Sequence, residues 1–398
     1  MIRKLTSSRL RTPLLLATLS LGLAALFSSS YWAQAPAPFE TDQLPTRGIW
    51  TRTAEAPISA RTGATIAWNG SEIIVVGGSH FICPGMALCR APTTPPLRDG
   101  AAYNPTSDTW RTIADAPHGI GSGSVASIGL DIYILAFTDW ETRSIRLLRY
   151  RSSFDYWEEI NLPGTFDSSY LVAFEDNILL GSYSDERGIV GDWLLDTNTQ
   201  RWEALPDDPL GLGFSRQFLA HGEDLYLFDH ALVPQPNGAS GPSYLRAARW
   251  RNQQWTVLPT ADSIGSAPIL VAGQLLIAAE AGCGDGGSSN NFGRCIPFGA
   301  VFDTATDTWR HLPSASESRG RYWGFSNGIG DDGLVIRGSA APFYDTRSNT
   351  WFRLPAVGTE MYAERSPQAA GPYGFSFGGI GYNPMGSQLL EEAWIWKP

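Results

Sequence analysis

The stretch YNPTSDTW, residues 103–110, joins Tyr103 at the end of one predicted β-strand to Trp110 near the start of the next. A polar turn separates the two aromatic residues, which is typical of an antiparallel hairpin. The same spacing recurs in the pairs Tyr150 with Trp157, Leu195 with Trp202, Phe302 with Trp309 and Tyr344 with Trp351, and in shortened form in Trp250 with Trp255. A local pattern that returns every roughly 40 to 60 residues indicates a repeat architecture. Because the tryptophan returns in each repeat, we expect it to pack between sheets rather than to bind a ligand.

Each repeat contains four predicted strands. In the first repeat, small residues occupy a strand at 61–68, an apolar strand follows at 73–76, a third strand ends at Tyr103 and a fourth opens at Trp110. Strand length and β-branched composition fit this assignment. The apolar second strand recurs at 132–137, 178–180, 225–228, 275–278, 334–336 and 374–377. The chain therefore carries seven predicted second strands.

The two ends of the chain are predicted to combine into one repeat. Trp50 begins a fourth strand that no complete repeat precedes, and residues 393–398 form a third strand that no fourth strand follows. Pairing of the two leaves no open sheet edge in the last repeat, which is how β-propellers close. We predict an all-β, seven-bladed β-propeller in which an N-terminal strand completes the last blade. Six blades is the alternative if either end stays unpaired.

The repeat resembles the kelch repeat over roughly residues 48–398. The first repeat shows the resemblance best, through Arg61, Gly63, the pair Gly77-Gly78 and the hairpin from Tyr103 to Trp110. The resemblance implies a kelch-type β-propeller. It does not settle function, because kelch propellers include both binding proteins and enzymes.

The N-terminal region has the composition of an export signal. Residues 1–35 combine a basic start with an apolar or small-residue run at 14–27, which is typical of a signal peptide or an N-terminal anchor. Residues 36–47 form a Pro-rich linker, and the predicted propeller occupies 48–398. We therefore expect a secreted or other extracytoplasmic protein, in the periplasm or at the cell surface. It would contact a membrane only through an uncleaved N-terminal segment.

The bulk charge limits the classes of partner. The formal net charge is −10, which argues against nucleic acid as a main partner. We expect a monomer.

The four cysteines form two local pairs, Cys83 with Cys89 and Cys283 with Cys295. An even number of cysteines in an exported chain predicts disulfides, each of which would pin one loop. A four-cysteine zinc site is the alternative, and it would require the two loops to meet over the channel. We favour the disulfides.

Loop length points to one rim of the predicted propeller. Loops between second and third strands emerge on the same side as the connections between blades, because antiparallel strands alternate in direction. This set contains the long loops, at 79–100, 138–144, 230–244, 281–298 and 380–391, whereas the other turns are short. We expect binding on the rim with the long loops.

Arginine opens several of the predicted first strands, which line the central channel. The ligand-binding candidates are Arg61, Arg216, Arg319 and Arg365, with Arg321, Tyr322 and Glu364 as possible extensions of the same site. On an acidic protein, such arginines would bind a carboxylate or sulfate group bidentately. The alternative, which we favour, is that they bond to neighbouring backbone and hold blades together, since a buried charge needs partners in either case.

These features predict a binding module for an extracytoplasmic protein or an acidic glycan. The alternative is a sugar-acting enzyme at the channel mouth, of the epimerase or mutarotase type or of the copper oxidase type, because the resemblance extends to bacterial sialic-acid epimerases and to galactose oxidase. The copper site of galactose oxidase requires a free cysteine crosslinked to tyrosine, and here each cysteine has a nearby mate. We therefore expect no cofactor and no metal, assign no catalytic residue and lean towards a protein that is not an enzyme.

Overall fold

The computed structural model describes residues 45–398 with internal gaps, at 84–88, 90, 91, 93, 167, 168, 186, 187, 232–244, 262–268, 279–299, 312–325, 330–333, 338–341, 349, 356, 358–362, 366, 384, 385 and 398. Within these ranges the regular structure consists of β-strands and contains no helix. The prediction of an all-β protein is confirmed. None of the described residues belongs to a helix that would span a membrane.

The described residues form seven four-stranded sheets and one three-stranded sheet, and all strand pairs are antiparallel. Six of the four-stranded sheets take four consecutive strands of the chain. The first two are β2 (Thr65–Trp68), β3 (Ile73–Val76), β4 (Gly100–Asn104) and β5 (Thr109–Ile113), then β6 (Ser122–Ile128), β7 (Asp131–Phe137), β8 (Ile145–Arg151) and β9 (Tyr156–Ile160). The next two are β10 (Ser169–Phe174), β11 (Asn177–Ser182), β12 (Trp193–Asp196) and β13 (Arg201–Ala204), then β14 (Gly213–His221), β15 (Asp224–Ala231), β16 (Leu245–Arg251) and β17 (Gln254–Ala261). The last two are β18 (Ile269–Ala272), β19 (Leu275–Ala278), β20 (Ala300–Asp303) and β21 (Thr308–His311), then β22 (Ser326–Ile329), β23 (Leu334–Arg337), β24 (Pro342–Asp345) and β25 (Thr350–Arg353).

The seventh four-stranded sheet combines the two ends of the described chain. Its order is β27 (Gln368–Ala370), β28 (Tyr373–Phe377), β31 (Ala393–Lys397) and β1 (Ile49–Arg52). Trp50 lies opposite Trp396, whose side chain is fully buried. The N-terminal strand β1 is thus the outer strand of the sheet that contains the C-terminal strand.

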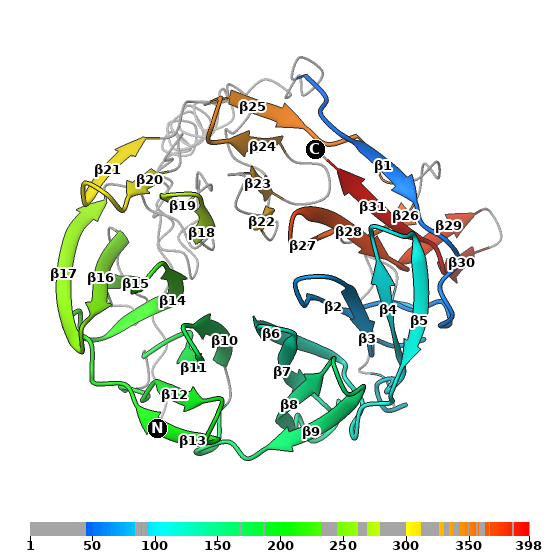
Figure 1. The fold of residues 1–398 in the computed structure, drawn as a ribbon, viewed down its shortest axis with the longest axis horizontal. Coiled ribbons are helices and arrows are strands. Elements are labelled where there is room, and N and C mark those ends of the chain that lie inside the picture. The colour runs from blue at the N-terminus through cyan, green and yellow to red at the C-terminus, as the bar shows by residue number, and fades with distance from the viewer. Residues whose placement is uncertain are drawn as a thin grey trace, which may run out of the picture. The chain divides into compact units, whose positions relative to one another are not determined.

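The inner strands bring neighbouring sheets together. β2, β6, β10, β14, β18, β22 and β27 contact one another in that order, and β27 also contacts β2. Figure 1 shows the sheets following one another around a common centre, with these first strands innermost and the fourth strands outermost. Repeated four-stranded sheets in this arrangement are those of a β-propeller.

The apolar second strands are buried on both faces. In β3, Ile74 and Val76 pack against Ile134 of the next sheet, whereas Ile73 and Val75 pack with Phe375 of the sheet that carries both chain ends. Side chains alternate between the two faces of a strand, so a strand sandwiched between two sheets needs apolar residues at consecutive positions. This is why the second strands are continuous apolar runs in the sequence.

The aromatic spacing follows from strand register. Tyr103 lies directly opposite Trp110 in β4 and β5, and their ring centroids are 5.0 Å apart. Asp108 makes the turn between them with a φ of 52° and accepts a hydrogen bond from the Tyr103 hydroxyl at 2.8 Å. The left-handed conformation favours aspartate among non-glycine residues. The turn therefore fixes the distance between the two aromatic residues in the sequence.

Each described tryptophan of the fourth strands also bonds to the neighbouring sheet. Its Nε1 donates to a backbone carbonyl just after the corresponding tryptophan of that sheet, in the bonds Trp110 to Ala54, Trp157 to Ala114, Trp202 to Asn161, Trp255 to Pro206 and Trp309 to Pro259. Trp50 makes the equivalent bond to the carbonyl of Pro355, which follows β25, at 3.0 Å. These side chains therefore join adjacent sheets.

The long loop predicted at 380–391 contains regular structure. This segment contains the hairpin β29 (Ile380–Asn383) and β30 (Gly386–Leu389), and β29 also pairs with β26 (Ala363–Glu364) in the three-stranded sheet. Pairing satisfies the backbone donors and acceptors of a segment that projects beyond the main sheets. The predicted segment 1–35 and most of the linker 36–47 lie outside the described residues.

Candidate functional site

Arg61 precedes β2 and is fully buried. Its Nη1 and Nη2 donate to the two carboxylate oxygens of Asp99 at 2.9 and 2.7 Å, and its Nε donates to the carbonyl of Ser59 at 2.8 Å. Nη1 also reaches the carbonyl of Gly77 at 3.1 Å. The hydrogen bonds from Arg61 lower the pKa of Asp99 below its ordinary value. The guanidinium thus ties the start of β2 to the segments before and after the β3–β4 loop.

Arg365 occupies the equivalent place before β27. Its Nη2 donates to Glu392 Oε2 at 2.8 Å, and the guanidinium carbon lies 6.0 Å from the centre of the Trp394 ring. Burial alone would raise the pKa of Glu392, but the bonds from Arg365 outweigh it and the pKa is lowered. Asp99 and Glu392 each stand immediately before the third strand of their sheet, β4 and β31. The two arginines therefore have carboxylate partners at corresponding positions.

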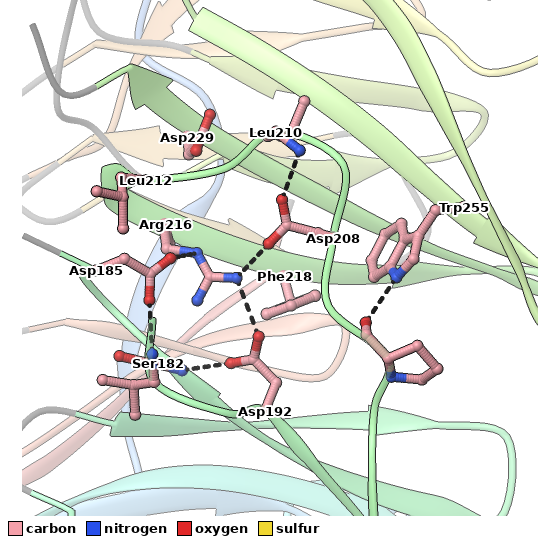
Figure 2. Close-up of polar contacts among 12 residues, drawn as sticks. Ser182, Asp185, Asp192, Asp208, Leu210, Leu212, Arg216, Phe218, Asp229 and Trp255 are labelled. Atoms are coloured by element: carbon pink, nitrogen blue, oxygen red, sulfur yellow. Dashed lines mark hydrogen bonds and ion pairs between the residues drawn. The ribbon is translucent and has the colours of Figure 1, made fainter. Parts of the chain in front are cut away.

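Arg216, in β14, contacts three carboxylates at once (Figure 2). Its Nη2 lies 3.0 Å from Asp192 Oδ2 and 2.8 Å from Asp208 Oδ2, and its Nε lies 3.0 Å from Asp185 Oδ2. The side chain of Arg216 is only 2% exposed. Asp185 and Asp192 come from the β11–β12 connection, and Asp208 comes from the connection between β13 and β14. The arginine thus joins two sheets at one junction.

The charges at this junction are unbalanced. Burial raises the pKa of both Asp185 and Asp192 above the ordinary aspartate value, against the opposing pull of Arg216. One guanidinium neutralises only one of the three carboxylates around it. The third guanidinium nitrogen, Arg216 Nη1, is buried and has no hydrogen-bond partner among the described residues. The cluster therefore holds more carboxyl groups than cationic groups, and one nitrogen of its guanidinium makes no hydrogen bond to the described residues.

A small open pocket lies at this cluster, and we call it the junction pocket. Its lining consists of Asp185, Ile189, Val190, Asp192, Leu205, Asp207, Asp208, Gly211 and Arg216. These residues come from the β11–β12 connection, from the β13–β14 connection and from β14. A loop between second and third strands and a connection between sheets thus form the pocket together, which is the combination expected on the binding rim.

Exposed apolar side chains occur on the two connections that form the junction pocket, and two of them, Ile189 and Val190, line it. Tyr183, Ile189, Val190 and Leu212 are 47%, 62%, 39% and 45% exposed, and we call these four residues the junction patch. The Tyr183 ring packs on Tyr170, with centroids 4.4 Å apart, so its position is fixed despite its exposure. Large apolar side chains gathered on a surface typically mark an interaction site.

Further contacts hold the pocket wall in place. Arg246 donates to the carbonyls of Leu210 and Leu212 at 2.7 and 3.2 Å, and it forms a bidentate pair with Asp229 at 2.8 and 2.6 Å. Asp229 is fully buried, and burial raises its pKa despite Arg246. Figure 2 shows Leu212 and Asp229 on the same side of the cluster as Leu210. Arg246 therefore holds the β13–β14 connection in one conformation.

His230 is a second buried group beside the junction. It is 4% exposed, stacks on Phe214 with ring centroids 5.5 Å apart, and has no hydrogen-bond partner at either ring nitrogen among the described residues. Burial lowers the pKa of His230 to about 4, so the ring is neutral at physiological pH.

The structure separates the predicted site residues. Arg61, Arg216 and Arg365 lie at different junctions, and each is held by carboxylates. Their arrangement supports the interpretation that they join segments of the fold, and ligand binding by them stays a prediction. Glu364 lies in the short strand β26. Arg319, Arg321 and Tyr322 lie outside the described residues.

The sequence analysis missed the carboxylates. Asp99, Asp192 and Glu392 share a sequence signal, because each directly precedes a third strand, β4, β12 and β31 respectively. The apolar residues of the junction patch had a weaker signal. Ile189 and Val190 stand between two glycines, as does Leu212, in short connections where large apolar residues would otherwise be uncommon.

Cys83 and Cys89 form a disulfide, as predicted. In this form neither sulfur is a thiolate, so the pair is not available to a four-cysteine zinc site. Cys283 and Cys295 lie outside the described residues. Among the residues that the structure describes, no group of histidine, cysteine or acidic side chains is arranged to hold a metal ion.

No protein-family model matches the chain. It is similar to Kelch-like protein 21 of Danio rerio, with 34% identity over 90 residues. The similar segment spans 22% of this chain and only 13% of that protein. Together with the repeated four-stranded sheets, this similarity fits a kelch-type β-propeller.

Proposed function

We propose that the chain is a seven-bladed kelch-type β-propeller closed by its N-terminal strand. Each four-stranded sheet is one blade, and the pairing of β1 with β31 supports closure within the last blade. The bond from Trp50 to the carbonyl of Pro355 supports closure between that blade and the one before it. In a closed ring each inner strand packs between two neighbouring inner strands, and each blade has a neighbouring blade on both sides.

The protein acts as a protein-binding module outside the cytoplasm. The disulfide between Cys83 and Cys89 supports an oxidising compartment, and so does the basic and apolar composition of residues 1–35. The similarity to a kelch-like protein supports protein binding in general, since scaffolds of this kind present loops on a rigid ring.

The observation that carries the proposal is the junction patch. Four large apolar side chains are exposed on two connections to which Arg216 and Arg246 bond, and two of the four, Ile189 and Val190, line the pocket. A rigid, partly apolar surface loses little conformational entropy when it binds, so it suits recognition of another protein. The contact surface of the propeller is therefore the rim at the β10–β13 and β14–β17 blades.

Site-specific photocrosslinking tests this proposal. A benzophenone amino acid replaces Ile189 in the junction patch, and a matched control replaces Phe154, which is 70% exposed in the turn between β8 and β9. Illumination of intact cells that make the chain is expected to give a protein adduct at position 189 and not at 154, recovered from an extracytoplasmic fraction. Adducts at 154 alone, or none at either position, would contradict the proposal.

The expectations of an acidic glycan and of a sugar-acting enzyme stay predictions. A thermal-shift screen with sialylated and sulfated oligosaccharides tests the first, because a ligand that binds only the folded state raises the melting temperature.

A further inference from the structure

The end of the β14–β15 hairpin on the binding rim is separated from the rest of the hairpin by an irregularity. Two residue pairs, Gly213 with Ala231 and Phe214 with His230, come before a β-bulge in β14 that interrupts the register. Ser215, within the bulge, has a φ of 50°, which is uncommon for serine. A segment held by only two residue pairs beyond a bulge opens more readily than the interior of a sheet. We call these two pairs the hairpin end.

The hairpin end is bonded to the β11–β12 connection. The amide of Asp185 donates to the carbonyl of Gly213 at 2.9 Å. The amide of Arg216 donates to the carbonyl of Tyr183, also at 2.9 Å. Phe214 lies between these two bonds and forms an isolated β-bridge with the same connection. The position of the junction patch, to which Tyr183 belongs, therefore depends on the hairpin end.

His230 is the buried histidine of the hairpin end. It is 4% exposed, its ring stacks on Phe214, and neither ring nitrogen has a hydrogen-bond partner among the described residues. A neutral imidazole tolerates these surroundings. An imidazolium ion would be a buried charge without an acceptor for either of its N–H groups, which is costly. Uptake of a proton therefore favours a conformation in which the ring reaches water.

The charged groups around His230 do not compensate a positive ring. Asp229 precedes it in β15, but Arg246 of β16 holds both carboxylate oxygens of Asp229. Arg246 also adds to the effect of burial and lowers the pKa of His230. The carboxylates of the two connections are bonded to Arg216 of β14, namely Asp185, Asp192 and Asp208. Neither β17, which pairs with β16, nor β18, which contacts β14, carries a titratable side chain.

We propose that His230 is an acid-sensitive switch for the binding rim. When its ring takes up a proton, the ring leaves its packing on Phe214 and the hairpin end opens at the bulge. The junction patch then loses its fixed position, and a protein bound there is released. The release rests on the proposed protein-binding function, whereas the opening does not.

The pH range of the switch follows from proton linkage. The pKa of His230 is about 4 with the hairpin end closed, whereas an open, hydrated ring titrates near the ordinary value of 6.5. The closed form is therefore fully stabilised above pH 6.5 and loses stability as the pH falls from 6.5 towards 4. At pH 5 the ratio of open to closed form is raised about 30-fold, because each pH unit below 6.5 contributes about a factor of ten.

The buried carboxyl groups act in the opposite direction. Burial raises the pKa values of Asp185, Asp192 and Asp229, so the closed form binds their protons more tightly than an open form would. Their protonation favours the closed form and offsets part of the effect of His230. A variant without the histidine should therefore become no less stable at this junction as the pH falls to 5.

Hydrogen–deuterium exchange of the full chain tests the opening. The readouts are the amides of Asp185 and Arg216, expressed as protection factors so that the intrinsic pH dependence of exchange is removed. We expect their protection to fall about tenfold between pH 7.5 and pH 5 in the wild type. In His230→Leu, which has no ring to protonate, protection should stay level or rise over the same range.

His221→Gln is the matched control. His221 ends β14 at the other end of the same hairpin and hydrogen-bonds to Gln274 at 3.2 Å, so its loss should leave the fall in protection unchanged. A wild type without the fall, or a His230→Leu variant with the same fall, would overturn the proposal. If His230→Leu does not fold, histidine-labelled NMR of the wild type decides. One of the five imidazole groups should remain neutral at pH 5, and titration of all five near pH 6.5 would overturn the proposal.

Crosslinking at position 189 at two pH values separates the switch from the proposed function. Adducts should form at pH 7.5, decrease about tenfold at pH 5, and persist at pH 5 when His230→Leu is also present. Equal adducts at both pH values in the wild type would overturn the release of the partner. If no adduct forms at either pH, the proposed binding rim fails, and the exchange of Asp185 and Arg216 decides separately whether the hairpin end opens in acid.

Discussion

At the scale of single residues, buried arginine side chains hold the connections between strands through hydrogen bonds and ion pairs. Arg61 is fully buried, and the hydrogen bonds of its side chain go to groups of its own sheet or of the segment before it, including both carboxylate oxygens of Asp99. A buried guanidinium is tolerated only when its donors are satisfied. The contribution of Arg61 to the fold is therefore large, although the residue looks like a ligand-binding group in the sequence.

Substitution of Arg61 tests whether this residue stabilises the fold. Arg61→Ala leaves the Asp99 carboxylate and the backbone carbonyls of Ser59, Gly77 and Asp99 without their donor. We expect the free energy of unfolding to fall by about 2–3 kcal/mol. The loss should be smaller than for a fully buried pair, because the Asp99 side chain is 42% exposed and is partly hydrated. Urea unfolding followed by tryptophan fluorescence measures the change.

The matched control for Arg61 is a surface ion pair. Arg111 pairs with Glu72 at 2.6 Å, but its side chain is 39% exposed. Arg111→Ala should therefore lower the free energy of unfolding by less than about 1 kcal/mol. Equal effects of the two substitutions would show that Arg61 does not hold the β2–β5 sheet together.

Part of the candidate site was predictable at this scale and part was not. The sequence indicates Arg216 as a special position, because arginine recurs near the start of several predicted first strands. Its partners Asp185, Asp192 and Asp208 were not identified, because they come from two different connections whose spatial meeting depends on how two sheets pack. A tertiary contact of this kind has no fixed spacing in the sequence.

At the scale of elements, the start of β14 is shaped by close packing around a carboxylate. A Cβ on Gly213 would lie 2.0 Å from Asp229 Oδ2, well inside contact distance. Asp229 is not free to move aside, because Arg246 holds both of its carboxylate oxygens. The absence of a side chain at position 213 therefore allows the β13–β14 connection to approach β15.

Gly213→Ala tests this packing. The added methyl group must displace Asp229 from Arg246 or shift the strand, and we expect the free energy of unfolding to fall by about 1–3 kcal/mol. In the control, Gly164→Ala, the nearest atom to the new Cβ is 3.7 Å away in Phe166, so stability should stay equal or rise slightly. Thermal unfolding by circular dichroism measures both, and a wild-type melting temperature for Gly213→Ala would disprove the packing argument.

The second strands were predicted more accurately than the first strand and the last hairpin, for a physical reason. The second strands were placed closely, as in 73–76 for β3, because burial on both faces gives a continuous apolar run. The first strand was predicted too long, at 61–68, whereas β2 begins at Thr65. Gly63, with a φ of 64°, interrupts the extended backbone between the isolated bridge at Thr62 and the start of β2. The hairpin of β29 and β30 was missed because its sequence, rich in glycine and polar residues, resembles a loop.

At the scale of the whole molecule, the two ends of the described chain are interdependent. β1 pairs only with β31, and Trp396 Nε1 donates to the carbonyl of Arg47 at 3.1 Å. Trp50 in turn donates to the carbonyl of Pro355, which follows β25 of the neighbouring sheet. The sequence predicted the pairing of the ends from strand counting alone, because each repeat had to supply four strands. It did not reveal which side chains hold them.

The last prediction concerns the N-terminal strand β1. Trp50 is 7% exposed and packs with Trp396, so Trp50→Ala removes a large buried side chain and its bond to Pro355. We expect the free energy of unfolding to fall by about 3–5 kcal/mol. Ile49→Ala alters the neighbouring residue of the same strand, which is 73% exposed, and should change stability by less than about 0.5 kcal/mol. In the closed ring that we propose, every blade packs against two neighbours. The Trp50 variant should therefore still unfold in one transition, at a lower urea concentration, when hydrogen exchange is monitored across all the sheets. Early exchange confined to the sheet of β1 and β31, with the others unchanged, would show instead that the blades do not depend on closure.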